Sequence, residues 1–139
     1  LGPSPAAPPG VDRPLAGRVP ILTSHWDAEP DLVAWYLEGR ADGFVVEATG
    51  AGNVNEGLAA GLVEALDRGL PVVVASRCVR GEATPIYGGV GGFATLHGRG
   101  AVSSHGLGAG KARLALQLAL GNAAGPAASA LFERFAGEV

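Results

Sequence analysis

The residues best suited to bind a small polar ligand lie in one glycine-rich stretch near the middle of the chain. Residues 49–53 follow a short β-rich run and place Gly50 and Gly52 on either side of a single residue. Glycines spaced in this way let the backbone turn tightly and approach a ligand closely. The amides of Asn53 and Asn55 come next, and Asn53 is predicted to cap the helix that follows. Because ligands of open α/β sheets lie outside the carboxyl ends of the strands, we expect a binding site here.

Two nucleotide-binding motifs are only partly present. The run from Gly50 has Asn55 where a dinucleotide-binding loop carries its third glycine, and no acidic residue ends the next strand about 20 positions later. The run that starts at Gly108 resembles a phosphate-binding loop, but His105 stands where its first glycine belongs, and Ala112 cannot supply a magnesium-binding hydroxyl. We therefore expect neither NAD nor a nucleoside triphosphate, and no cofactor.

The remaining candidates for chemistry stand alone in the sequence. None of the histidines has a partner at metal-ligand spacing: His25, His97 and His105. The single cysteine, Cys78, excludes an internal disulfide and a cysteine-based zinc site, and we interpret it as a small buried residue. Arg77 follows a strand and either binds a carboxylate or pairs with Glu82, two alternatives that the sequence leaves open. No metal site is expected.

Length and composition indicate a globular protein with one core. The chain has 139 residues, of which 47% are hydrophobic and 17% charged. Its net charge of −3 argues against nucleic acid or an anionic membrane as a partner, and no apolar run is long enough to span a bilayer. No signal peptide is recognisable, so the cytoplasm is the expected location, with the periplasm or secretion left open. The missing initiator methionine suggests a fragment or a processed chain.

The hydrophobic pattern predicts alternating strands and helices after a proline-rich start. Residues 1–18 are interpreted as a linker or tail, and residues 19–139 as one domain. Strands are predicted at 19–23, 44–48, 70–76 and 101–104. Helices are predicted from Pro30 to Gly39 and at 54–68, 111–120 and 127–135, with one further turn at 93–97 inside the long glycine-rich segment 77–100. This order predicts a three-layer α/β/α fold with a four-stranded, mainly parallel sheet of the flavodoxin/Rossmann-like class.

The spacing of large apolar residues predicts which helix faces are buried. In the first helix Leu32, Trp35 and Tyr36 share one face, which is the pattern of a core-facing stripe. The apolar faces around Leu58 and Leu114 are expected to belong first to the core and second to an interface between subunits.

Four segments, in this order and spacing, resemble the C-terminal domain of bacterial-type L-asparaginases. They are Asp42-Gly-Phe-Val-Val-x-x-x-Gly-x-Gly-Asn-x-Asn, Gly69-Leu-Pro-Val-Val-Val-x-Ser-Arg-Cys, Tyr87-Gly-Gly and Gly110-Lys-Ala-Arg-Leu-x-Leu-Gln-Leu-Ala-Leu. The resemblance covers about residues 19–135. It implies an enzyme family that hydrolyses the side-chain amide of L-asparagine, and more weakly that of glutamine, to L-aspartate or glutamate and ammonia.

The same resemblance implies that the catalytic residues lie outside this chain. The family's nucleophilic threonine belongs to a strand ending in Thr-Gly-Gly-Thr-Ile, and a second threonine belongs to a Thr-Asp-Thr segment; neither segment occurs here. We therefore expect no catalytic residue in this chain and no turnover by the chain alone. The implied partners are an N-terminal asparaginase domain and further copies of the chain, because active sites of this family form between subunits.

Five residues are predicted to contact the substrate, L-asparagine, or to support that contact. Asn55 matches the family's asparagine that reaches the α-amino and carboxylate groups of a substrate in the neighbouring subunit, and Gly52 and Asn53 lie in the same loop. Some family members add a glutamate from the long loop, but the matching region here carries no acid. Tyr87 and Glu82 are the nearest substitutes.

Three other interpretations remain open at this point. One is the asparaginase-like subunit that deamidates glutamine for tRNA-dependent amidation, which only a flanking domain or partner could distinguish. A second is a non-catalytic module that binds an amino acid for regulation. The third is a structural fragment without a function of its own.

Overall fold

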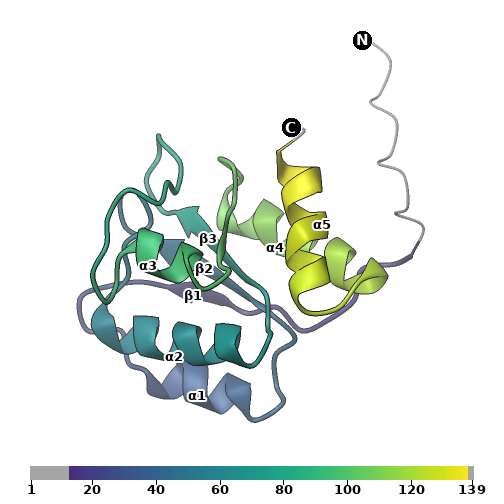
Figure 1. The fold of residues 1–139 in the computed structure, drawn as a ribbon, viewed down its shortest axis with the longest axis horizontal. Coiled ribbons are helices and arrows are strands. Elements are labelled where there is room, and N and C mark those ends of the chain that lie inside the picture. The colour runs from purple at the N-terminus through teal and green to yellow at the C-terminus, as the bar shows by residue number, and fades with distance from the viewer. Residues whose placement is uncertain (1–12, 138–139) are drawn as a thin grey trace.

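A parallel sheet forms the centre of the computed structural model, which describes residues 13–137 (Figure 1). The strands are β1 (Ile21–Thr23), β2 (Phe44–Ala48), β3 (Val72–Ser76) and β4 (Val102–Ser103). They lie in the order β1-β2-β3-β4, and every neighbouring pair is parallel. The predicted three-layer α/β fold with a four-stranded parallel sheet is confirmed. Because the order along the sheet is sequential, these strands contain no reversal of the kind that locates the site in doubly wound folds.

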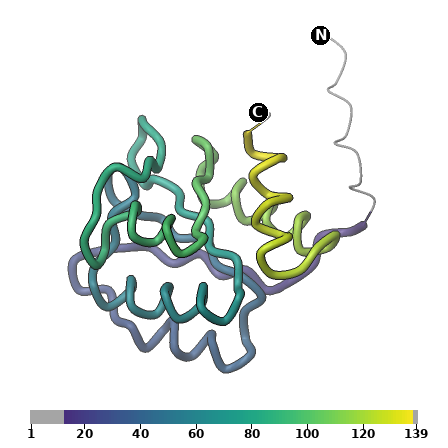
Figure 2. The backbone as a smooth tube through the Cα atoms, in the orientation of Figure 1, coloured from purple at the N-terminus to yellow at the C-terminus, as the bar shows by residue number. Residues whose placement is uncertain are grey.

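Five helices of the described residues cover the two faces of the sheet. They are α1 (Asp31–Leu37), α2 (Glu56–Asp67), α3 (Phe93–His97), α4 (Ala109–Asn122) and α5 (Pro126–Ala136). Right-handed crossovers between sequential parallel strands carry the connecting helices to one face, so α1, α2 and α3 lie together. The last two helices follow β4 and cover the other face (Figures 1 and 2).

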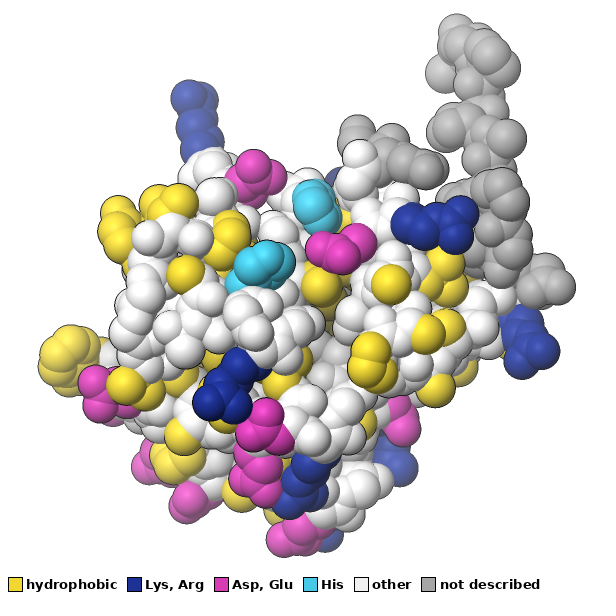
Figure 3. All heavy atoms as spheres, in the orientation of Figure 1, with side chains coloured by type: hydrophobic (Ala, Val, Ile, Leu, Met, Phe, Trp, Pro, Cys, Tyr) yellow, Lys and Arg dark blue, Asp and Glu magenta, His cyan; other side chains and the backbone are white. Residues whose placement is uncertain are grey.

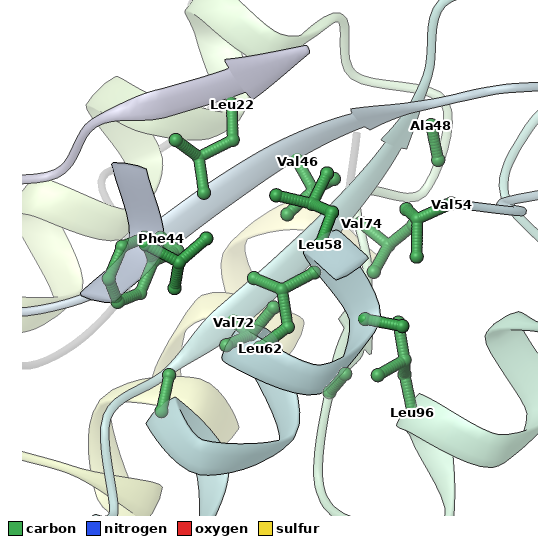
Figure 4. Close-up of a cluster of buried hydrophobic side chains, with 14 of the residues drawn as sticks. Leu22, Phe44, Val46, Ala48, Val54, Leu58, Leu62, Val72, Val74 and Leu96 are labelled. Atoms are coloured by element: carbon green, nitrogen blue, oxygen red, sulfur yellow. The ribbon is translucent and has the colours of Figure 1, made fainter. Parts of the chain in front are cut away.

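Two hydrophobic clusters lie between the layers, one on each face of the sheet. Successive side chains of the central strands belong to one cluster and the other in turn. On β2, Phe44 and Val46 belong to the cluster under α1, α2 and α3, whereas Val45 belongs to the cluster under α4 and α5. Figure 4 shows Leu58 and Leu62 of α2 among the strand side chains of the first cluster. A strand buried on both faces needs no polar alternation, which explains the continuous apolar run in the sequence.

The buried face of α1 differs from the predicted one. Val33 and Leu37 are buried, whereas Leu32 and Trp35 are half-exposed. The cause lies in α2: a Cβ added at Gly61 would stand 2.7 Å from Cβ of Val33, so the missing side chain of Gly61 lets the two helices approach there. Of the predicted face, Leu32 and Trp35 are therefore not in the core, whereas Tyr36 is partly buried and packs against it.

The second correction concerns α4. Leu114 is 50% exposed and does not belong to the core. The helix instead turns a row of mostly small side chains towards the sheet: Ala109, Ala112, Leu116 and Ala119 are its buried residues. Alanines allow the helix backbone to lie close to the strands. The leucines alternate along the sequence and do not mark this alanine-rich face as the buried one.

The stretch before β1 follows the surface of α4. The Ala16 backbone N–H donates to the carbonyl of Gln117 at 3.0 Å, and the Gln117 amide donates back to Gly17 at 2.9 Å. Arg113 donates to the carbonyl of Val19 at 2.8 Å. The predicted tail 1–18 lies outside the described residues up to position 12, and its boundary at position 18 stays a prediction. Within residues 13–137 no helix is long and apolar enough to cross a membrane.

Candidate functional site

A pocket lies at the carboxyl ends of β1 and β2, beside the first turn of α2. We call it the first pocket; its volume is about 880 Å³. Its lining residues come from the segments after β1 and β2 and from the long segment after β3. Its polar lining residues are Ser24, His25, Thr49, Asn53, Asn55, Glu56 and Tyr87, and Trp26 supplies the largest apolar side chain.

The loop after β2 is a tight turn closed by its own backbone. The Thr49 N–H donates to the carbonyl of Asn53 at 2.8 Å, and the Asn53 N–H donates to Thr49 at 2.9 Å. Gly52 has φ of +114°, and a Cβ there would stand 2.9 Å from Cβ of Phe93. Gly52 is buried and does not line the first pocket, so its part is to let the loop pack on α3.

The helix cap is Asn55 rather than Asn53, which corrects the predicted assignment. The Oδ1 atom of Asn55 accepts from the Leu58 N–H at 3.0 Å, and α2 begins one residue later. The Nδ2 group of Asn55 donates to the carbonyl of Ala28 at 2.7 Å and to that of Trp26 at 3.4 Å. Both amide hydrogens are therefore directed at this chain's own backbone, and one lone pair of Oδ1 is left for a ligand.

Asn53 has the opposite arrangement. It is held through its backbone, by the two bonds to Thr49 and by a third bond from the Thr49 hydroxyl to its carbonyl at 3.0 Å. Its side chain lines the first pocket next to Asn55. The Asn53 amide can therefore both donate to and accept from a ligand, which is the role that the sequence suggested for Asn55.

Ser24 connects the segment after β1 to β2 and to the residues before α2 and after β3. It is 2% exposed, and its N–H donates to the carbonyl of Glu47 at 2.8 Å. Its hydroxyl accepts from the Asn55 N–H at 3.3 Å, and its carbonyl accepts from Arg77 at 3.0 Å. Arg77 thus bonds a backbone carbonyl rather than Glu82, and it fixes the β1–α1 loop beside the cap of α2.

Tyr87 and Glu82, only five residues apart, lie in different pockets. Tyr87 is half-exposed and lines the first pocket. The glycines after it bring this segment close to the residues that precede α2: the Val54 N–H donates to Gly91 at 2.9 Å, and a Cβ at Gly92 would stand 2.3 Å from the Tyr87 carbonyl oxygen. Glu82 instead lines a second pocket of about 360 Å³.

The second pocket lies at the ends of β3 and β4. It is lined by Ser76, Cys78, Val79, Arg80, Gly81, Glu82, Ser104, Gly106, Leu107 and Gly108. Cys78 is exposed there, which corrects its interpretation as a buried residue. The structure therefore brings Asn53, Asn55 and Tyr87 together and leaves Glu82 apart.

Several residues of the first pocket were not identified as site residues from the sequence, among them His25, Trp26 and Glu56. His25 Nδ1 lies 2.9 Å from Asp27 Oδ1, and this hydrogen bond holds the pKa of Asp27 below its ordinary value of 3.8. Trp26 is 96% exposed at the rim. Glu56 follows the cap directly and was interpreted only as part of a helix.

The hydroxyl groups of Thr49 and Ser76, at this edge of the sheet, are engaged in structure. The Thr49 hydroxyl donates to the carbonyl of Asn53, and the Ser76 hydroxyl donates to that of Gly50 at 2.7 Å. Neither is bonded to a side chain that could act as a general base, as an activated nucleophile requires. The amide and hydroxyl side chains of the first pocket are suited to bind a ligand through hydrogen bonds.

Fold and site together define a three-layer α/β domain that presents a polar pocket at the carboxyl ends of its strands. Residues 18–130 match the family described as the Glutaminase/Asparaginase C-terminal domain. The chain belongs to this family, as the sequence resemblance predicted.

Curated relatives agree with this membership. The chain is 42% identical over 106 residues to a probable L-asparaginase of Deinococcus radiodurans, which covers 76% of this chain and 32% of the relative. It is 35% identical over 65 residues to a subunit of the glutamyl-tRNA(Gln) amidotransferase of Methanothermobacter thermautotrophicus, which covers 47% of this chain and 15% of the relative. The chain thus spans about a third of the length of the probable L-asparaginase and a smaller part of the amidotransferase subunit.

Proposed function

We propose that this chain serves as the substrate-completing domain of an L-asparaginase, which hydrolyses L-asparagine to L-aspartate and ammonia. The observation that carries the proposal is the first pocket, in which the amides of Asn53 and Asn55 and the ring of Tyr87 converge. These groups suit a ligand with several hydrogen-bonding groups, and the engaged hydroxyls of Thr49 and Ser76 fit a domain that binds substrate without attacking it.

The catalytic threonines would come from an N-terminal asparaginase domain docked at the same edge of the sheet. The loops after β1 and β3 support this partner, because large apolar side chains are exposed on them: Trp26, Val79, Ile86, Tyr87 and Val90. Hydrophobic side chains are visible over this part of the molecule in Figure 3. An exposed apolar group of this kind marks an interaction surface.

The docked domain would belong to a neighbouring copy, which makes the protein a homo-oligomer. The stretch from Ala16 to Val19 lies along α4 at the amino end of β1, whereas the first pocket lies at the carboxyl end of that strand. A domain connected through this stretch joins the chain on the side away from the pocket. The N-terminal domain of a second subunit is not connected through this stretch, so it can dock at the first pocket.

Ammonia release from L-asparagine tests the proposal. We expect no release by the 139-residue chain alone and release when the chain is combined with an N-terminal asparaginase domain. Release by the chain alone would show that it contains a nucleophile, with Thr49, Ser76 and Thr84 as the first candidates. If the combined domains release no ammonia but L-aspartate raises the melting temperature, a non-catalytic binding module would be favoured.

The second candidate is a subunit that deamidates glutamine for tRNA-dependent amidation. It is favoured by the two amidotransferase subunits among the relatives, at 35% and 28% identity. Ammonia release from glutamine that depends on an added amidotransferase partner and on acylated tRNA would select this candidate. Equal release from L-asparagine with and without that partner would select the asparaginase.

A further inference from the structure

The first pocket contains one acidic side chain and one basic side chain among its described lining residues. The acid is Glu56, the first residue of α2, and the base is His25, which is paired with Asp27. All other polar lining side chains are amides or hydroxyls, apart from the indole of Trp26. A free α-amino acid carries an ammonium group that requires an acceptor, preferably an anionic one, once it leaves water.

The position of Glu56 beside Asn55 gives the pocket a local excess of acceptors. Both amide hydrogens of Asn55 are directed at the carbonyls of Trp26 and Ala28, so this side chain offers a ligand only the second lone pair of Oδ1. An oxygen acceptor and a carboxylate in consecutive residues at one wall of the pocket suit a cationic group at that wall.

We infer that Glu56 is the specificity-determining residue that receives the α-ammonium group of the substrate, with Oδ1 of Asn55 as its neighbouring acceptor. This inference rests on the proposed function and refines it. Glu82, the acid that the sequence offered for this task, lines the second pocket. Asn53, whose loop is closed through backbone bonds and the Thr49 hydroxyl, is left to donate its side-chain amide to the substrate carboxylate.

Glu56 also has a structural effect that a test must separate from binding. A carboxylate in the first turn stabilises a helix through the peptide dipoles, so removing its charge weakens α2 slightly in any case. A change in stability therefore says nothing about ligand binding. The informative quantity is the difference in affinity between two ligands that differ only in the ammonium group.

L-aspartate and succinate form such a pair, because succinate is aspartate without its α-amino group. We propose to measure their dissociation constants by calorimetry for the 139-residue chain combined with the N-terminal domain. The variants are Glu56→Gln, which keeps the size of the side chain, and Glu29→Gln as a control. Glu29 lines a neighbouring pocket together with Asp27, and its substitution produces the same change in net charge.

The expected result is selective. Glu56→Gln weakens the binding of L-aspartate about tenfold, as the loss of a charged hydrogen bond predicts. The affinity for succinate stays unchanged or rises slightly, because a repulsive charge is gone. Glu29→Gln changes neither ligand. Equal weakening of both ligands, or no weakening of L-aspartate, would overturn the role of Glu56 while the proposed function stands. If the unsubstituted protein binds neither ligand and releases no ammonia, the proposed function fails and this inference fails with it.

Discussion

The first and the second pocket differ in how the adjoining helix begins. At the first pocket, α2 starts with a side-chain cap from Asn55, and that cap is tied to the loop after β1. At the second pocket, α4 starts at Gly108 with no side-chain cap, and the buried Ser104 hydroxyl has no hydrogen-bond partner among the described residues. The start of α2 is thus held by side-chain hydrogen bonds to the loop after β1, whereas the start of α4 has no side-chain cap.

The comparison teaches that residue type alone does not locate a site. Both pockets contain a carboxylate and hydroxyls, and both lie where ligands of α/β proteins bind. Only the first combines amide side chains with a rigid frame, because Ser24 and Arg77 fix the loop that Asn55 holds. A binding surface requires this kind of support to keep its polar groups in place.

The largest effect is expected from adding one methyl group to each pocket's loop. Gly52→Ala forces a side chain onto a backbone with φ of +114° and places its Cβ 2.9 Å from Phe93. We expect a loss of about 3 kcal/mol in the free energy of unfolding, measured with urea. Gly108→Ala is the matched control: φ is −64° and its Cβ would meet nothing within 4 Å, so a change within about 1 kcal/mol is expected. Equal losses would contradict the account of the two loops.

The next comparison separates the two asparagines. Asn55→Ala removes the α2 cap and leaves the Ala28 carbonyl without its donor, so we expect a loss of about 2–3 kcal/mol of stability. Asn53→Ala is expected to change the free energy of unfolding by less than about 0.5 kcal/mol and to weaken the binding of L-aspartate about fivefold. Urea unfolding and calorimetry measure both quantities. A stability loss at Asn53 larger than at Asn55 would reverse the assigned roles.

A smaller effect distinguishes Tyr87 from Glu82. Removal of the Tyr87 hydroxyl in Tyr87→Phe is expected to weaken the binding of L-aspartate about threefold, which corresponds to the loss of one neutral hydrogen bond. Glu82→Gln is expected to leave the affinity unchanged, because Glu82 lines the other pocket. Calorimetry on the combined domains gives both constants. Weaker binding with Glu82→Gln would restore the function that the sequence suggested for this residue.

The smallest effect concerns the Asp27–His25 pair. Because the hydrogen bond from His25 lowers the pKa of Asp27, the ionised carboxylate stabilises the fold above the pKa of the unfolded chain, and this contribution disappears as the pH falls through the lower folded pKa. Asp27→Asn should therefore reduce the fall in melting temperature between about pH 5 and about pH 3. The change will be slight because the carboxylate is 89% exposed. A larger fall in the variant would contradict this sign.

The central strands β2 and β3 were predictable from sequence because they are buried on both faces, which gives each a continuous apolar run. Phe44–Ala48 was predicted residue for residue, and the helical turn at 93–97 was found within a long irregular segment. The buried faces of α1 and α4 were not predictable from leucine spacing, since Gly61 and the alanines of α4 decide where the helices approach their neighbours.

The site was predictable in its location and less so in its details. The glycine loop identified Asn53 and Asn55, but either asparagine could cap the helix, and the start of α2 lies at position 56 rather than 54. Glu82 and Tyr87 are close in sequence, yet the turn between them separates their side chains into two pockets. Contributions of the β1–α1 loop, such as His25 and Trp26, depend on strand order, which no local pattern reveals.

The most direct test of the central claim is a chemical-shift map of the isotope-labelled chain, combined with the N-terminal domain and titrated with L-aspartate. The backbone amides of residues 49–57 and 87–92, which border the first pocket, are expected to shift in a saturable way. Those of residues 78–82 and 104–108, at the second pocket, are expected to remain in place. Saturable shifts confined to the second pocket would contradict the assignment of the substrate site.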